Sequence, residues 1–134
     1  MSALSEIEGI GEVYASKLNA IGVSSIEKLL EIGGTKKGRQ TLAHDADISE
    51  KLLLNWVNRA DLARIKGIST QYADLLEAAG VDSVPELAQR NAHNLMQMMA
   101  DTNEAKNLVR KLPTESQVID WVAQAKTLPR AVSH

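Results

Sequence analysis

The stretch IEGIGEVYA, residues 7–15, recurs later in the chain as IKGISTQYA, residues 65–73. Over the longer windows 7–30 and 65–88, 11 of 24 positions are identical. A weaker match pairs Trp56 and its neighbours with Trp121 and its neighbours, so the two halves also end alike. Self-similarity of this kind is the signature of a duplicated structural unit. The sequence therefore predicts two tandem repeats, residues 1–62 and residues 63–134.

The composition favours helices and excludes a β-sheet. Hydrophobic residues make up 44% of the chain, but aromatic residues only 3% and phenylalanine is absent, so the core must be mainly aliphatic. The alternating β-branched and aromatic runs that mark strands are missing. Gly22 and Gly80 suit the ends of helices, while Ser24 and Ser83 stand three residues before a glutamate, as in a capping box. We expect an all-α protein.

Each repeat opens with a pattern typical of a helix-hairpin-helix. In the first copy it reads Gly9, Ile10 and Gly11, followed by Ala15 and Leu18. Glycines allow a tight turn with positive φ, the isoleucine fills the core, and the small alanine lets two helices cross closely. Such a turn exposes the first amides of the following helix, which together with the helix dipole bind a phosphate oxygen without reading sequence.

The second copy differs from the first in its turn and in its charges. Ser69 replaces the second glycine, and a left-handed serine costs about 1 kcal/mol. Arg64 and Lys66 precede the second turn, whereas Glu8 and Glu12 flank the first and repel a phosphate. The sequence therefore predicts that the second hairpin is the main contact, through the residues Arg64, Lys66, Gly67, Ile68 and Ser69.

Further candidates for nucleic-acid contact are the first turn, Gly9, Ile10 and Gly11, and a basic cluster formed by Lys36, Lys37 and Arg39. The formal charge of −2, from 15 basic and 17 acidic residues, argues against strong binding of a polyanion. A second interpretation is therefore a protein-interaction or scaffold module, with a protein partner or a second copy, in which the hairpins are only structural corners. Both interpretations stay open.

The sequence gives no sign of catalysis, of a cofactor or of a metal. With no cysteine, disulfides and thiolate chemistry are excluded, and the three histidines lack ligand spacing. We expect a non-enzymatic protein. No apolar stretch is long enough to cross a bilayer and the N-terminus does not resemble a signal peptide, which predicts a cytoplasmic protein without a membrane partner.

Several stretches resemble a widespread bacterial family of domains of unknown function with helix-hairpin-helix repeats, and the likeness runs over nearly the whole chain. They are Gly38-Arg39 with TLA (41–43), ISEKLL (48–53), WVNRADL (56–62), RIKG (64–67), YADLLEAAGV (72–81), and Gln117 with Asp120-Trp121. The resemblance implies two tandem repeats of the SAM-domain-like, helix-hairpin-helix type packed into one compact helical protein. DNA binding follows from it only by analogy with other hairpin proteins.

Overall fold

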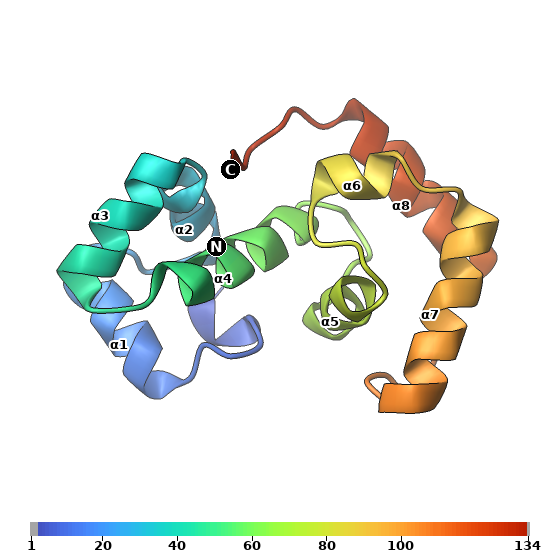
Figure 1. The fold of residues 1–134 in the computed structure, drawn as a ribbon, viewed down its shortest axis with the longest axis horizontal. Helices are drawn as coiled ribbons and strands as arrows, with labels where there is room; N and C mark the ends of the chain where they lie inside the picture. The colour runs from blue at the N-terminus through green and yellow to red at the C-terminus, as the bar shows by residue number, and fades with distance from the viewer. Residues whose placement is uncertain (1–2, 134) are drawn as a thin grey trace. The chain divides into compact units, whose positions relative to one another are not determined.

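A computed structural model describes residues 3–133, and it confirms the all-α expectation (Figure 1). Within that range there is no β-strand. The elements, in chain order, are the 3-10 helix η1 (Leu4–Glu6) and the helices α1 (Glu12–Ala20), α2 (Ile26–Gly33), α3 (Lys36–Ala46), α4 (Glu50–Leu62), α5 (Thr70–Ala78), α6 (Val84–Ala88), α7 (Ala92–Lys106) and α8 (Glu115–Thr127).

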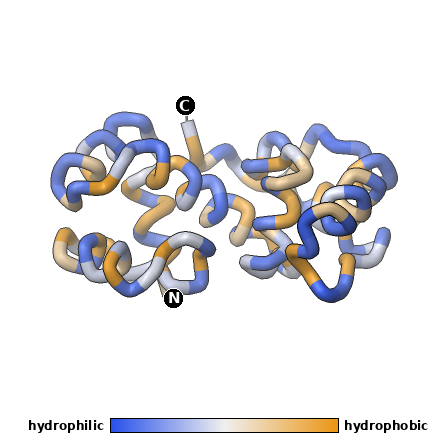
Figure 2. The backbone as a smooth tube through the Cα atoms, turned by 60° about the horizontal axis from the view of Figure 1, so that its bottom comes forward, coloured by the Kyte–Doolittle hydropathy of each residue, from blue (hydrophilic) through white to orange (hydrophobic). Residues whose placement is uncertain are grey.

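The chain divides into two compact units, and each has its own apolar core. Unit 1 is Met1–Asp61 with Ala131–His134, and unit 2 is Leu62–Arg130. Apolar and polar positions alternate along the helices of both units (Figure 2), as expected for amphipathic helices that bury one stripe. The division lies close to the predicted repeat boundary, except that the C-terminal residues return to unit 1.

Unit 1 is built around Trp56, which α4 carries and which is buried among apolar residues of α1 and α2. The C-terminal segment completes this core, because Val132 is buried in it. The backbone amide of Ser133 also donates to the carbonyl of Gly34 at 2.7 Å. The approach is so close that a Cβ on Gly34 would lie 2.4 Å from the carbonyl oxygen of Ala131.

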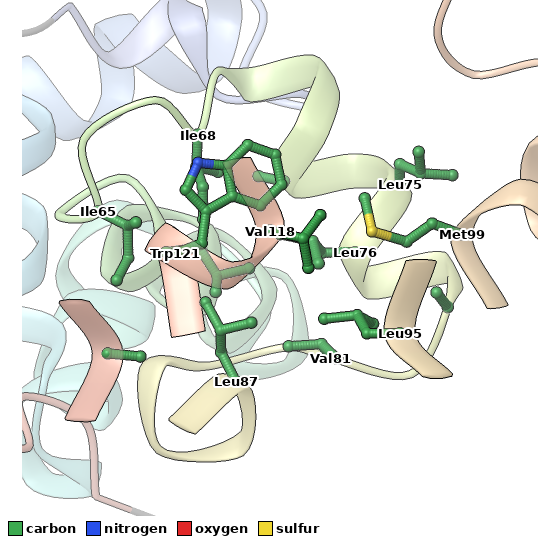
Figure 3. Close-up of a cluster of buried hydrophobic side chains, with 14 of the residues drawn as sticks. Ile65, Ile68, Leu75, Leu76, Val81, Leu87, Leu95, Met99, Val118 and Trp121 are labelled. Carbon is green, nitrogen blue, oxygen red and sulfur yellow. The ribbon is translucent and has the colours of Figure 1, made fainter. Parts of the chain in front are cut away.

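Unit 2 has an equivalent centre in Trp121, which α8 carries. Figure 3 shows this core, to which α5 contributes Leu76, α7 contributes Met99 and the hairpin turn contributes Ile68. Both tryptophans are 1% exposed. The two tryptophans stand at matching positions of the sequence and are core residues of the two units, and the partly buried Tyr14 and Tyr72 pack against these cores.

One detail of the helices differs from the sequence prediction. The N-cap of α2 is Ser25 and not Ser24, since the Ser25 hydroxyl accepts the amide of Lys28 at 3.1 Å. The two units also differ in length between matching helices. α7 has 15 residues where α3 has 11, and the loop after α7 is longer than the loop after α3.

Candidate nucleic-acid interface

Both hairpin turns depend on a glycine with a left-handed backbone. Gly9 has φ +94° and Gly67 has φ +99°. A Cβ on Gly9 would lie 3.2 Å from Nε1 of Trp56, and a Cβ on Gly67 would lie 2.8 Å from Nε1 of Trp121. Two separate reasons therefore require glycine at the first position of each motif. A side chain there would be strained by the positive φ value, and it would be crowded by the indole ring.

Each tryptophan also contacts the tyrosine of the helix that follows the turn. The ring centroids of Tyr14 and Trp56 are 5.1 Å apart, and those of Tyr72 and Trp121 are 5.3 Å apart. Tilted aromatic pairs at this distance contribute about 0.5–1.5 kcal/mol beyond the burial of their area. The indole therefore holds the turn and the start of the next helix together in both units.

A polar side chain one turn after each tryptophan binds the backbone just before the glycine. In unit 1, Nη1 of Arg59 donates to the carbonyl of Glu8 at 2.6 Å. In unit 2, Nε2 of Gln124 donates to the carbonyl of Lys66 at 3.0 Å and its Oε1 accepts the amide of Lys66 at 2.9 Å. Arg59 and Gln124 occupy matching positions in the weaker sequence match, and that spacing was the signal that could have revealed them.

The central isoleucines of the two turns are not surface contacts. Ile10 is 3% exposed and Ile68 is 7% exposed. Their amides are also occupied, because Ile10 donates to the carbonyl of Ile7 at 3.1 Å and Ile68 to that of Ile65 at 3.3 Å. Both side chains fill the core, as the sequence indicated, and both amides are used within the turn, so these two residues shape the turn and do not contact a nucleic acid themselves.

The predicted strain at Ser69 is wrong. Gly11 has φ −84° and ψ −174°, and Ser69 has φ −77° and ψ 172°, so both have an extended backbone that any residue adopts. Both are N-caps, and the Ser69 hydroxyl accepts the amide of Tyr72 at 3.2 Å. Serine is therefore a good residue here, and the second hairpin is as well shaped as the first. The amides before Tyr72 in the first turn of α5 have no partner within the helix.

The charges of the two turns differ as the sequence indicated. Lys66 and the neutral Gln71 are exposed around the second turn, and Gly67 itself is exposed. Arg64 is only partly exposed, because its Nη1 donates to the carbonyl of Pro129 at 3.0 Å. In the first turn, Glu8 and Glu12 are both exposed. The guanidinium of Arg59, which donates to the carbonyl of Glu8, offsets part of the negative charge of the first turn. Near the second turn, the carboxylate of Asp120 accepts from Nε2 of Gln124 at 2.8 Å. The residues of the second turn itself are basic or neutral and those of the first are acidic or neutral, so the second turn is the more favourable one for a phosphate.

The basic cluster of unit 1 does not act as one surface. Lys36 and Lys37 are exposed at the start of α3, but Arg39 is 4% exposed. Its guanidinium donates to the carbonyls of Gly33, Gly34 and Ser133, and so holds the C-terminal segment. Burial lowers the pKa of this guanidinium, while the charge of Glu50 opposes the shift. Arg39 is a structural residue, so its prediction as a phosphate contact is wrong.

Other kinds of site find little support in the described residues. Between residues 3 and 133, no three His, Cys, Asp or Glu side chains are grouped so that they could hold a metal ion. In the same range, no helix has the length and apolar character needed to cross a membrane. The two exposed turns are therefore the candidate binding sites considered below.

Comparison with known proteins places the chain in a family. Residues 8–128, which contain both turns, match the family model described as Domain of unknown function (DUF4332). The chain belongs to this family. No curated protein and no solved structure matches the DUF4332 chain. The predicted membership of a domain-of-unknown-function family is confirmed, and the function of the DUF4332 chain has to be argued from its own residues.

Proposed function

We propose that this protein is a non-enzymatic module of two helix-hairpin-helix repeats, and that the hairpin of unit 2 binds the phosphate backbone of nucleic acid, DNA first of all. The observation that carries the proposal is the exposed Gly67 turn, which Trp121 and Gln124 hold in place before the start of α5. Because the turn is rigid before binding, little conformational entropy is lost when a ligand binds.

The ligand follows from the chemistry at the start of α5. The first-turn amides and the positive end of the helix dipole attract an anion, and Lys66 adds a full positive charge beside them. The donors at this site are backbone amides and one lysine, which bind phosphate oxygens and carry no sequence information. The contact is therefore with phosphate and independent of sequence, in the weak range of about 10⁻⁴–10⁻⁶ M for non-specific binding at physiological salt.

Fluorescence anisotropy with a labelled duplex and a labelled single strand, at two salt concentrations, tests the proposal. We expect the affinity of the wild type to fall with salt, with a log–log slope of about 0.9 for each phosphate contacted. Lys66→Glu should abolish binding, while Lys106→Glu, the same charge change at an exposed position of α7, should cause a smaller loss. Equal losses for the two variants, or no binding at low salt, would contradict the proposal.

A second candidate function, protein interaction or scaffolding, is favoured by the surface of the first turn. Val13, the second residue of α1, is 69% exposed and stands next to Glu12. Gln71 occupies the matching position in unit 2, so the hairpin fold does not need an apolar residue here. An acidic, partly apolar turn suits a protein better than a phosphate. Under this candidate, wild-type protein associates with protein and gives no anisotropy change with DNA.

A further inference from the structure

The first of two complementary surfaces is the first-turn patch, which consists of Glu8, Glu12 and Val13. All three side chains are exposed, and Val13, at 69%, is more exposed than the other large apolar residues of the described part of the chain. The nearest cation along α1 is engaged elsewhere, because Nζ of Lys17 donates to the carbonyl of Asp47 at 3.3 Å and lies 5.9 Å from the centre of the Tyr14 ring. Beside Glu8, Nη1 of Arg59 donates to the Glu8 carbonyl at 2.6 Å and offsets part of the charge there. The patch therefore combines an exposed apolar side chain with the neighbouring carboxylate of Glu12.

The second surface is a pocket of about 590 Å³ in unit 2, which we call the α8 pocket. One face of α8 lines it with Ile119, Ala123 and Lys126, at the i, i+4 and i+7 spacing of a single helical stripe. Ile119 is 52% exposed, an unusual position for a large β-branched side chain on a helix surface. The opposite wall is the turn from α6 to α7, which contributes Arg90.

The charge of the α8 pocket is positive. Its lining contains Arg90 and Lys126 and no carboxylate. The guanidinium of Arg90 is engaged by groups outside the lining, namely the carbonyl of Gly80 at 3.2 Å, the sulfur of Met98 at 3.4 Å and the carboxylate of Glu86 at 3.4 Å, which offsets its charge. Lys126 is exposed on α8 and supplies the remaining positive charge. Apolar side chains beside a lysine fit an apolar side chain that stands next to a carboxylate.

We propose that the first-turn patch of one copy docks in the α8 pocket of a second copy. Val13 would pack on Ile119 and Ala123, while Glu12 would pair with Lys126. The match in both charge and apolar character selects this occupant. Since the two surfaces are different patches of the same chain, the contact is heterologous, and association continues from copy to copy unless it closes into a ring. The proposal does not depend on nucleic-acid binding.

Sedimentation analysis of nuclease-treated full-length protein, over a range of concentrations at low salt, tests the contact. Wild type should gain mass with concentration. Glu12→Lys and Lys126→Glu should each weaken association about tenfold, because each places like charges opposite one another. The double variant Glu12→Lys/Lys126→Glu restores opposite charges and should recover most of the affinity. A mixture of the two single variants should also associate more tightly than either variant alone.

Matched controls separate this contact from general effects of charge and folding. Glu31→Lys and Lys106→Glu make the same charge changes at other exposed positions and should leave association unchanged. Val13→Gln introduces the residue that unit 2 tolerates at the matching position, so it should fold normally and weaken association. A monomer at all concentrations overturns the proposal, as does association that the charge reversals and Val13→Gln leave intact. Neither result bears on the phosphate-binding proposal, which the fluorescence anisotropy experiment tests separately.

Discussion

Replacing Gly67 with alanine probes the contact that fixes the second turn. At φ +99° an alanine costs about 1–2 kcal/mol, because its Cβ meets the backbone. The new Cβ would also lie 2.8 Å from Nε1 of Trp121, and forcing a methyl group into a packed core costs about 1–3 kcal/mol. Trp121 is wedged among buried residues and has little room to move. The sum for Gly67→Ala is about 2–5 kcal/mol of unfolding free energy.

Gly80→Ala is the matched control within the same unit. Gly80 has nearly the same backbone, φ +98°, but the added Cβ would meet only the end of the flexible Arg90 side chain, at 3.1 Å. Its cost should therefore be the backbone term alone, about 1–2 kcal/mol. Urea denaturation followed by tryptophan fluorescence measures both. If Gly67→Ala and Gly80→Ala lose the same stability, the indole does not constrain the turn and the reasoning is refuted.

Three other predictions concern the remaining parts of the site. Ser69→Ala should lose about 1 kcal/mol of unfolding free energy and Ser69→Gly only a few tenths, because Ser69 is an N-cap; a more stable Ser69→Gly in thermal denaturation would instead mean that the serine is strained. Arg39→Ala should lower the unfolding free energy by about 2–4 kcal/mol, because it leaves buried carbonyls without a donor. It should also let carboxypeptidase digest the C-terminal segment, which mass spectrometry would detect. A segment that stays protected would show that Arg39 does not hold it. Glu8→Lys combined with Glu12→Thr gives the first turn the residues that the second has at the matching positions, and should raise DNA affinity in anisotropy measurements; unchanged affinity would mean that charge is not what separates the two turns.

The sequence predicted the parts of the site that depend on residue type and spacing. The two halves have a glycine, a tyrosine and a tryptophan at matching positions. These matches were enough to predict equivalent turns and buried aromatic residues. Some of these features depend only on neighbouring residues, and the others recur in both halves. A residue that recurs in both halves can be recognised as structurally important even when the residue it contacts is distant in the sequence. Gln124 and Arg59 also stand at matching positions. Because the two side chains differ, only the structure showed that both bind the backbone just before the glycine.

What the sequence could not predict depends on burial and on backbone conformation. Lys36, Lys37 and Arg39 are close together in the sequence. In the structure the two lysines are on the surface, whereas the arginine is buried and donates to the carbonyl of Ser133, 94 residues away. At Ser69 the motif suggested a left-handed turn, although only its first glycine has positive φ. In both cases residue type alone leaves several physical roles open.

The amide resonances of the two turns give the most direct test of phosphate binding. In a titration of isotope-labelled protein with a short DNA duplex at low salt, followed by two-dimensional NMR, the amides of Ser69, Thr70 and Gln71 should shift most. Those of Glu12 and Val13 in the first turn should stay in place, because Glu8 and Glu12 repel the phosphate. Unshifted amides at the start of α5, or shifts of equal size in both turns, would contradict the account.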